Sequence, residues 1–408
     1  MMRPDSIAVL TQQVAHYHAA RYRAAQAVFG SLTVISVMNA ADFQEFLSRD
    51  VSNLSIIRLF DGRDSYMAAV RRGHVRRAVY SALDRLKPSV VAVAGWSFPE
   101  SLSAIAWAEM NRVGTVMMSD TQEHDSRRYL LREAIKSRVV SACDAALVAG
   151  RQQRDYIVQL GMPHERVFLG YDAVDNCYFS DGADRARADA IGLRHRHGLP
   201  ERYILASARF IPKKNLEKLL TAFARALELG PTPHHLVILG DGPGRAALQA
   251  AIASAGLGSR VVLAGFKDYE SLPAFYGLAD AFVHVSLAEQ WGLVINEAAA
   301  AGLPLVVSNV CGAGTELVVP DSNGILVDPN DVENMAQALW QVMTLPNAER
   351  EAMGQASRRV VADWGPARFA DGLRKASEAA FEAPRRRLST LDRSLMRILA
   401  RHYISDVS

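Results

Sequence analysis

The chain has 408 residues, of which 50% are hydrophobic and 22% are charged, and its formal net charge is +3. This composition is typical of a globular protein rather than a disordered one, and the length allows two domains of ordinary size. The small charge argues against nucleic acid as the main partner but leaves contact with a membrane surface open. No apolar run approaches about 18 residues, so we expect no transmembrane helix.

The start of the chain and its cysteines indicate a cytoplasmic protein. The first five residues lead directly into a predicted strand, which is not the pattern of a signal peptide. Cys143, Cys177 and Cys311 are scattered and include no C-x-x-C pair, which is typical of reduced thiols.

The N-terminal half alternates short apolar runs with helical patterns, which predicts a doubly wound α/β sheet. The expected strands are Ile7–Leu10, Leu32–Met38, Ser55–Leu59, Val90–Ala94, Gly114–Ser119, Ala145–Val148 and Arg166–Leu169. The clearest helical patterns are Ala15–Val28, Ala68–Leu86 and Arg127–Ala142. The stretch from Gly182 to Pro200 is charged and has little apolar content, so we expect it to link two domains.

Two cations follow the first predicted strand of the C-terminal half. The strand Tyr203–Ser207 leads into a loop with Arg209 and Lys214, and an amphipathic helix begins at Leu216. In open α/β sheets, ligands bind at the carboxyl ends of the strands. The planar fork of an arginine and the point charge of a lysine can neutralise a diphosphate there without a metal. Taken alone, the pair is equally consistent with two surface cations.

Two glutamates eight positions apart, Glu289 and Glu297, flank Gly292. The buried strand Ala281–Val285 is predicted before them, and an alanine-rich helix that ends near Gly302 is predicted after them. A helix start offers free N–H groups and positive dipole charge to a phosphate, while carboxylates accept hydrogen bonds from hydroxyls. This combination suits a sugar nucleotide. The alternative is a strand-loop-helix unit with two solvated glutamates.

Together these segments resemble the C-terminal half of the family-4 retaining glycosyltransferases, which belong to the glycosyl transferases group 1 and have the GT-B fold. The matching motifs occur in order between about Arg202 and Leu339: Ser207-Ala208-Arg209, Lys213-Lys214-Asn215, Val237 to Pro243, Ala264-Gly265-Phe266, Leu278-Ala279-Asp280, Ser286 to Glu297, Ala300 to Val306, Gly324 to Pro329, and Asp331. The resemblance implies two Rossmann-like doubly wound domains that face a central cleft. Residues 1–185 would bind the acceptor and residues 200–370 the nucleotide-sugar donor.

The resemblance also implies the role of each donor-side residue. Arg209 and Lys214 would bind the diphosphate and stabilise the leaving group, Glu297 would accept from the ribose hydroxyls, and Glu289 would hold the donor sugar. The remaining contacts would come from the backbone: phosphate and sugar from Gly292, Leu293, Val294 and Ile295, the base from Gly265, Phe266 and Lys267, and the cleft lining from Gly240 and Asp241. Trp291 stands where many members have Phe, and either packs in the core or alters sugar choice.

The acceptor side departs from the family pattern. Relatives often carry a glycine pair in the first strand-to-helix loop, but here the loop has none, and Gln12, His16 and Tyr17 are candidates for side-chain contacts. Trp96 lies at a strand end where the family often has a histidine, so no catalytic histidine is carried over. Asp120, Glu123 and His124 follow another strand and are candidates for positioning the acceptor hydroxyl. Helix capping and ordinary surface polarity explain these three equally well.

The end of the chain is expected to be helical over residues 371–408. A helix from about Ala367 to Phe381 would cross back to the N-terminal domain, as in other GT-B proteins. Beyond Pro384, three arginines and an alternation of apolar residues with arginines predict a short basic amphipathic helix. It fits peripheral contact with the inner membrane face, but a helix docked on its own domain is the favoured interpretation.

The resemblance implies transfer of a hexose from a nucleotide-diphosphate sugar to a hydroxyl of a saccharide, a lipid-linked saccharide or a small molecule, with retained configuration. A UDP-sugar is the favoured donor and a GDP-sugar the second choice. No D-x-D motif occurs, so we expect no metal and no cofactor. Two alternatives stay open: an epimerase or phosphorylase on the same fold, and a catalytically silent partner subunit. The presence of all four residues Arg209, Lys214, Glu289 and Glu297 argues against a catalytically silent subunit.

Overall fold

The computed structural model describes residues 4–38, 51–125, 128–384 and 388–400. Within them the chain forms two compact units. Of these, unit 1 contains residues 4–38, 51–123, 128–173, 366–384 and 388–400, and unit 2 contains residues 124–125 and 174–365. Unit 2 is therefore inserted into the sequence of unit 1. No described helix combines the length and the hydrophobicity that a membrane-spanning segment requires.

The described part of unit 1 is built on a seven-stranded parallel sheet of order β3-β2-β1-β4-β5-β6-β7. Its strands are β1 (Ile7–Thr11), β2 (Leu32–Ser36), β3 (Ile56–Arg58), β4 (Val90–Ala94), β5 (Gly114–Ser119), β6 (Ala145–Val148) and β7 (Val167–Leu169). Its helices are α1 (His16–Val28), α2 (Arg63–Arg71), α3 (Val75–Leu86), α4 (Pro99–Asn111), α5 (Leu130–Ser141), α6 (Arg151–Gln159), α16 (Pro366–Glu382) and α17 (Thr390–Leu399), with the 3-10 turn η4 (His164–Arg166).

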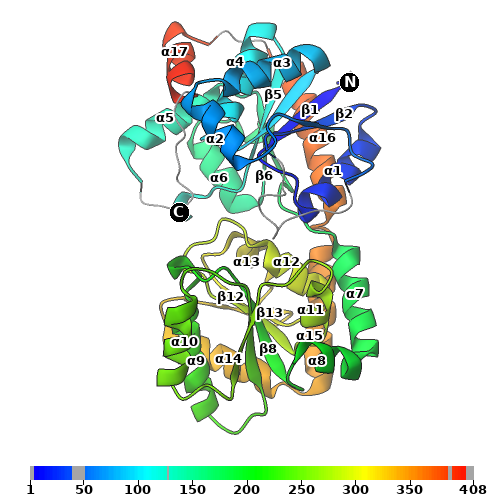
Figure 1. Cartoon of the computed structure of the whole chain (residues 1–408), viewed down its shortest axis with the longest axis vertical. Helices are drawn as coiled ribbons and strands as arrows, with labels where there is room; N and C mark the ends of the chain where they lie inside the picture. The colour runs from blue at the N-terminus through cyan, green and yellow to red at the C-terminus, as the bar shows by residue number, and fades with distance from the viewer. Residues whose placement is uncertain (1–3, 39–50, 126–127, 385–387, 401–408) are drawn as a thin grey trace. The chain divides into compact units, whose positions relative to one another are not determined.

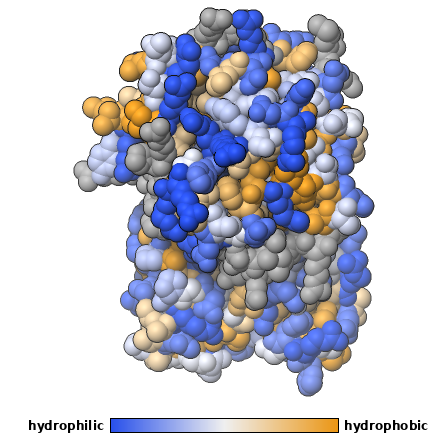
Figure 2. Space-filling view, turned by 45° about the horizontal axis from the view of Figure 1, so that its top comes forward, coloured by the Kyte–Doolittle hydropathy of each residue, from blue (hydrophilic) through white to orange (hydrophobic). Residues whose placement is uncertain are grey.

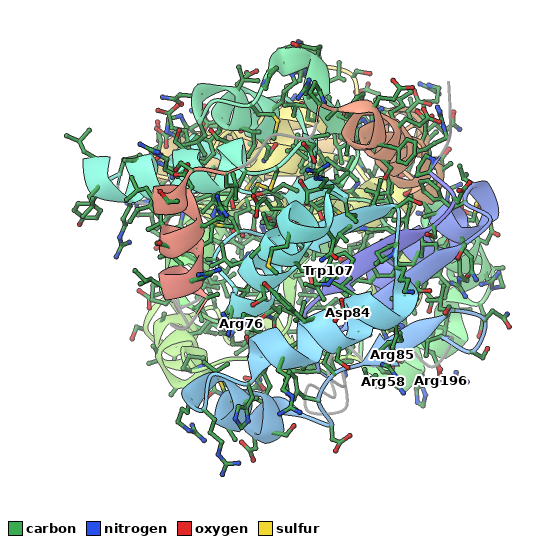
Figure 3. All side chains as sticks on the ribbon, turned by 90° about the horizontal axis from the view of Figure 1, so that it is seen from above. Arg58, Arg76, Asp84, Arg85, Trp107 and Arg196 are labelled. Atoms are coloured by element: carbon green, nitrogen blue, oxygen red, sulfur yellow. The ribbon has the colours of Figure 1, made fainter. Side chains whose placement is uncertain are left out.

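Both faces of this sheet are covered, which explains why its strands are nearly continuous apolar runs. Along β1, Ala8 and Leu10 pack against α3 and α4, while Ile7 and Val9 pack against α1 and α16. The indole N–H of Trp107 on α4 donates to Asp84 on α3 (2.7 Å), and Figure 3 labels both residues. Complete burial of a large apolar side chain such as Leu10 contributes about 1.5–3 kcal/mol to the stability of the fold.

The last helices of the chain belong to unit 1. Phe369, Leu373 and Ala376 of α16 are fully buried beside β5, β6 and α1 (Figure 1). On α17, Met396 is buried in the core on the side of α4, and the Arg138 guanidinium of α5 pairs with Asp392 at 3.0 Å. The tail helix is thus docked on unit 1 through its Met396 face.

Unit 2 has a six-stranded parallel sheet of order β10-β9-β8-β11-β12-β13 in its described residues. The strands are β8 (Tyr203–Ser207), β9 (His235–Leu239), β10 (Val261–Gly265), β11 (Ala281–His284), β12 (Leu305–Ser308) and β13 (Gly324–Val327). The helices are α7 (Asn176–Ala188), α8 (Ala190–His197), α9 (Leu216–Glu228), α10 (Arg245–Ser254), α11 (Leu272–Gly277), α12 (Leu293–Ala300), α13 (Gly312–Leu317), α14 (Val332–Thr344) and α15 (Asn347–Ala362), with the 3-10 turn η5 (Pro212–Lys214).

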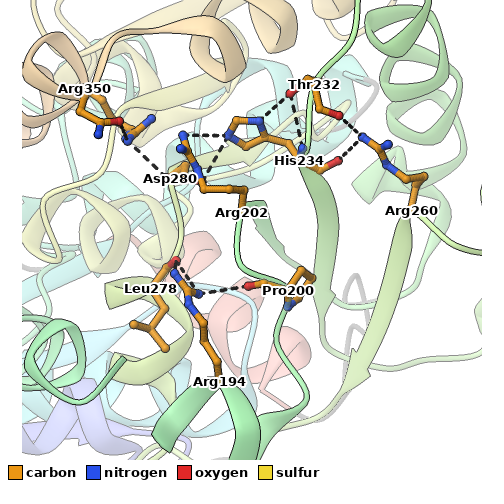
Figure 4. A network of polar contacts seen from close by, with 10 residues as sticks. Arg194, Pro200, Arg202, Thr232, His234, Arg260, Leu278, Asp280 and Arg350 are labelled. Carbon is orange, nitrogen blue, oxygen red and sulfur yellow. Dashed lines mark hydrogen bonds and ion pairs between the residues drawn. The ribbon is translucent and has the colours of Figure 1, made fainter. Parts of the chain in front are cut away.

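The amino edge of the unit 2 sheet is closed by a polar network around Asp280 (Figure 4). Arg202, just before β8, donates to Asp280 at 2.8 Å, and His234 and Arg350 lie 3.2 and 3.4 Å from its carboxylate. Burial opposes ionisation of Asp280, but the hydrogen bonds from His234 and Arg202 lower its pKa overall. The Asp280 of the sequence motif is therefore a structural residue, remote from the carboxyl edge of the sheet.

Two predicted boundaries differ from the structure. The single helix predicted over 68–86 is wrong, because Gly73 adopts a left-handed φ of +69° and separates α2 from α3. The stretch Gly182–Pro200 forms parts of α7 and α8 instead of an irregular link, and the chain passes between the units at 173–174 and 365–366. Its low apolar content has two causes: α8 buries none of its residues, and the buried positions of α7 in this stretch are the small residues Gly182, Ala183 and Ala186.

Candidate active site

The candidate site of unit 2 lies at the carboxyl edge of its sheet, between β8 and β11. These strands are the first and fourth of the unit in sequence, yet they are neighbours in the sheet. Ligands of open parallel sheets bind at such a switch point in strand order. The loop after β8 carries Arg209 and Lys214, and the loop after β11 carries Glu289.

The loop after β8 is anchored by Asn215, which follows the turn η5 in a left-handed conformation with φ +60°. Its buried amide donates to the carbonyls of Val285 (3.1 Å) and Pro329 (2.7 Å), which follow β11 and β13. Lys214 is only 12% exposed. Arg209 is exposed, and its side chain forms no ion pair or hydrogen bond with any described residue.

Three side chains converge on one carboxylate oxygen of Glu289, Oε2. The Lys214 ammonium forms an ion pair with it, the His284 Nε2 lies 2.9 Å away, and the Ser286 hydroxyl donates from 3.2 Å. Burial alone would raise the pKa of Glu289, but His284 and Lys214 together hold it well below its usual range. Glu289 is therefore an ionised hydrogen-bond acceptor at any ordinary pH.

Gly292 directly precedes α12 and has a backbone conformation that favours glycine. Its φ is +98°, and an added Cβ would lie 3.1 Å from Ile295 and 3.2 Å from Glu289. The Ile295 N–H donates to the Gly292 carbonyl at 2.9 Å. The first N–H groups of a helix, here those of Leu293 and Val294, have no acceptor within the helix and carry its positive dipole charge.

Glu297 projects from the same helix and accepts a hydrogen bond from the Tyr276 hydroxyl of α11 at 2.7 Å. Burial raises the pKa of Glu297 to about 7, and the Tyr276 hydrogen bond offsets only part of that rise. The two glutamates of the motif thus differ in charge state: Glu289 is always ionised, whereas Glu297 titrates near neutral pH.

The loop after β9 packs against the loop after β8 through Gly240. Its φ is +115°, and an added Cβ would lie 2.0 Å from the Ala208 carbonyl oxygen. The Phe210 N–H also donates to the Asp241 carbonyl at 2.9 Å. This close approach brings the predicted residues Gly240 and Asp241 beside the loop that carries Arg209.

The predicted base-binding segment follows β10, which is hydrogen-bonded to β9. The Gly265 carbonyl accepts from the Gly240 N–H at 3.0 Å. The Phe266 ring is 45% exposed, and the Lys267 ammonium lies 5.5 Å from the centroid of the Phe275 ring. The segment is thus hydrogen-bonded to the loop after β9, which contains Gly240. Its contact with a base stays a prediction.

Trp291 packs in the core of unit 2. It is 2% exposed, its ring lies 5.1 Å from that of Trp364, and its indole N–H donates to Asn296 at 2.9 Å. Of the two roles that the sequence left open, the structure favours packing.

The switch point of unit 1, between β1 and β4, holds a buried carboxyl group that sequence reasoning missed. Gln12, which follows β1, donates to Glu100 in the first turn of α4, and the Tyr66 hydroxyl donates to the other Glu100 oxygen at 2.8 Å. Burial raises the pKa of Glu100 to about 7, while the Tyr66 hydrogen bond lowers it in part. Gln12 is thus tied to Glu100.

Tyr17 lies in a second polar cluster at the start of α1. The Arg21 guanidinium lies 4.9 Å from the Tyr17 ring centroid and pairs with Asp172 at 2.9 Å. Burial raises the pKa of Tyr17 to about 12, Arg21 lowers it, and the negative charges of Asp172 and Asp120 add to the rise. Asp120 is therefore within electrostatic reach of Tyr17. His16 is the first residue of the same helix and is half-buried.

The remaining acceptor-side candidates lie apart from these clusters. Trp96 is 9% exposed and contacts Tyr156 edge to face at 6.2 Å. Glu123 and His124 are exposed on the 3-10 turn η3 (Glu123–Asp125), and among the described residues no hydrogen bond or ion pair joins their side chains to the other candidates. The surface-polarity interpretation therefore remains open for both.

Sequence reasoning missed four residues that shape the two edges: Glu100, Tyr276, His284 and Ser286. The available signal was a polar residue inside or directly beside an apolar element, as with His284 at the end of the otherwise apolar β11. Within the described residues, no group of three or more His, Cys, Asp and Glu side chains is arranged to hold a metal ion.

The part of the chain that carries this arrangement is similar to known proteins. Residues 193–360 match the sequence model of the glycosyl transferases group 1. The chain is 34% identical over 196 residues to the alpha-D-kanosaminyltransferase of Streptomyces kanamyceticus, covering 48% of this chain and 49% of that protein. It is 32% identical over 207 residues to the GDP-mannose-dependent alpha-(1-6)-phosphatidylinositol monomannoside mannosyltransferase of Mycobacterium tuberculosis, covering 47% and 53%. The aligned part thus spans about half the length of these two relatives.

Solved structures support the fold over nearly the whole chain. The sucrose-phosphate synthase of Thermosynechococcus elongatus has a TM-score of 0.69 at 20% identity, covering 90% of this chain and 97% of that one. The Anabaena protein HepE, solved in complex with UDP and glucose, also has a TM-score of 0.69, at 16% identity, covering 90% and 98%. At these identities the likeness concerns the fold alone.

Proposed function

We propose that the chain is a retaining glycosyltransferase of group 1 that uses a nucleotide-diphosphate sugar without a metal, because residues 193–360 match that family and the chain has the GT-B fold. The observation that carries the proposal is the set of groups at the carboxyl edge of unit 2. Arg209, Lys214 and the start of α12 supply positive charge, and Glu289 and Glu297 supply acceptors.

The proposed chemistry is activation of the leaving group. A sugar–phosphate bond breaks more easily when the departing diphosphate meets fixed cations and amide dipoles. Arg209 is exposed, and Lys214 has three donors, so it can hold Glu289 and still reach a phosphate oxygen. In the proposed route the leaving phosphate accepts the proton of the acceptor hydroxyl on the same face, so the configuration is retained without a separate base.

We infer a UDP-sugar as donor, with a GDP-sugar as the second choice. HepE was solved with UDP and glucose, and the mycobacterial relative is named as GDP-mannose-dependent, so both bases occur among the proteins that this chain resembles. The acceptor is a hydroxyl of a saccharide, a lipid-linked saccharide or a small molecule. Epimerase, phosphorylase and silent-subunit roles are the alternatives to be tested.

Thermal shifts with UDP, GDP and ADP, each with and without EDTA, test the donor side. We expect one nucleotide to raise the melting temperature, and the rise to survive EDTA. A rise that EDTA abolishes would contradict the metal-free site. No rise with any of the three would contradict nucleotide binding and favour a silent subunit.

We also propose that unit 1 contacts anionic membrane surfaces through α5 and α17. Leu130 and Leu131 at the start of α5 are 93% and 75% exposed, and Leu391 and Ile398 of α17 are 66% and 57% exposed. Figure 2 shows hydrophobic surface protruding at the left edge of unit 1. The two helices carry five basic and two acidic side chains, so the exposed apolar residues belong to helices with a net positive charge.

Sedimentation with phosphatidylcholine vesicles, with and without phosphatidylglycerol, tests this contact. We expect binding only to the anionic vesicles, and a loss of at least about tenfold when Leu130 and Leu131 are both changed to serine. The matched control is Ile191→Ser, because Ile191 is 89% exposed on α8 of unit 2. Equal binding by the double variant and the wild type would refute the proposal.

A further inference from the structure

His284 is an unusual residue for its position. It ends β11, an interior strand between β8 and β12 whose residues are all buried, and it is itself 4% exposed. A polar ring placed there costs free energy unless it finds a hydrogen-bond partner. Its partner is the carboxylate of Glu289, five residues further along the chain.

The contacts of His284 determine the direction of the Glu289 side chain. The imidazole is nearly parallel to the Phe282 ring, with 7° between the planes, and this packing restrains its own orientation. Its Nε2 lies 2.9 Å from Glu289 Oε2 and 3.0 Å from the Ser286 hydroxyl, which in turn donates to the same carboxylate oxygen at 3.2 Å. His284 and Ser286 therefore clamp one oxygen from the strand side.

The backbone of Glu289 is restrained as well. Glu289 forms an isolated parallel bridge with Cys311, and its carbonyl accepts from the Gly312 N–H at 3.3 Å. Both ends of the residue are thus held by elements other than the loop after β8, which carries Lys214.

We propose that His284 and Ser286 are positioning residues that keep the Glu289 carboxylate aimed at the donor sugar while Lys214 turns to the diphosphate. This inference rests on the proposed glycosyltransferase function. If Lys214 were the sole partner of Glu289, the orientation of the carboxylate would depend on an ammonium group that is shared with the phosphate. With His284 and Ser286 in place, donor binding and sugar orientation are served by different groups.

The electrostatics agree with this division of labour. Burial opposes the charge of Glu289, and the hydrogen bond and charge of His284 are the largest influences that lower its pKa, ahead of those of Lys214. The His284 hydrogen bond is therefore a favourable contact of the carboxylate that does not depend on Lys214.

The test compares His284→Phe, His284→Gln and Ser286→Ala with the wild type. The ring of Phe fills the space without a donor, whereas Gln restores a donor. UDP, GDP and ADP binding by thermal shift reports on the diphosphate site, and turnover of UDP-glucose, GDP-mannose and ADP-glucose, including hydrolysis to the nucleoside diphosphate, reports on sugar orientation. His235→Phe is the matched control, because His235 begins β9 at the opposite edge of the same sheet.

We expect His284→Phe to bind the nucleoside diphosphate like the wild type while kcat falls about 10- to 100-fold, the usual effect of losing a hydrogen bond to a charged group. His284→Gln should recover most of that loss, Ser286→Ala should lose several-fold, and His235→Phe should change neither quantity. Combining His284→Phe with Glu289→Gln should cost no more than Glu289→Gln alone, since both act through one carboxylate.

The outcomes separate the two proposals. A wild type that binds no nucleoside diphosphate and turns over no sugar nucleotide contradicts the proposed function. An active wild type with unchanged kcat in His284→Phe, or with additive losses in the double variant, overturns the positioning role. If His284→Phe fails to fold, the test rests on the other two variants. An unchanged kcat in Ser286→Ala, together with a large loss of kcat in His284→Gln, then overturns the positioning role as well.

Discussion

Replacing Glu297 by Gln should stabilise the protein at high pH while weakening its ligand site. Burial raises the pKa of Glu297 from 4.5 to about 7. A carboxyl group with a raised pKa binds more protons in the folded state, so its favourable contribution is present below pH 4.5 and is lost as the pH rises toward 7. Glutamine keeps an oxygen for the Tyr276 hydroxyl and carries no charge at any pH.

The size of the effect follows from the pKa values of Glu297 in the unfolded and folded protein. A difference of one between two pKa values corresponds to about 1.4 kcal/mol, so full linkage between pH 5 and pH 8 would cost the wild type about 2.5 kcal/mol relative to the variant. Because Glu297 is half-buried, water screens part of this cost, and we expect about 1–2 kcal/mol. For a unit of this size that corresponds to a rise of about 2–8 °C in melting temperature at pH 8.

Thermal melts of the wild type, Glu297→Gln and the exposed control Glu351→Gln at pH 5, 6.5 and 8 measure this gain. The advantage of Glu297→Gln should grow with pH, and the control should show none. Nucleotide affinity of the wild type should improve from pH 6 to 8 as Glu297 ionises, and the variant should bind about tenfold more weakly at pH 8. A pH-independent stability difference, or unchanged affinity, would refute the assignment of Glu297 as a titrating ribose acceptor.

Three further substitutions test other parts of the structure. Arg209→Ala should lower kcat about 100-fold or more with no loss of fold, while the exposed neighbour Lys213→Ala stays within a few-fold; equal losses would remove Arg209 from the leaving-group role. Gly240→Ala should lower the melting temperature and nucleotide affinity together, because its Cβ would overlap the Ala208 carbonyl, and a normal melt would contradict the described loop contact. Met396→Asp should destabilise unit 1 by about 2–5 kcal/mol in denaturant unfolding, and no change would contradict docking of α17.

The sheet strands were predictable because parallel strands buried on both faces appear as apolar runs. Val90–Ala94, Gly114–Ser119 and Ala145–Val148 were predicted with the bounds that the structure gives them. The helix break at Gly73 was missed because the apolar spacing continues across it. The stretch from Gly182 to Pro200 was misjudged because α8 buries no residue and the buried positions of α7 there are small, so the stretch has the low hydrophobicity of a linker.

The site was predictable where residues follow one another along the chain and not where they meet across it. Glu289, Gly292 and Glu297 lie within nine residues, so their spacing around a helix start was visible in the sequence. The partnerships of Gln12 with Glu100 and of Tyr276 with Glu297 depend on strand order and helix packing, which no local pattern encodes. Their roles toward substrate stay predictions.

The insertion of unit 2 into unit 1 has a consequence for the order of events during synthesis. The core of unit 1 includes Phe369, Leu373 and Ala376 of α16, which are translated after the whole of residues 174–365. At about 5–20 residues per second, the first 173 residues wait roughly 10–40 s for the helix that completes their core. Unit 2 can therefore reach its native structure on the ribosome first, and unit 1 must avoid aggregation until α16 has been synthesised.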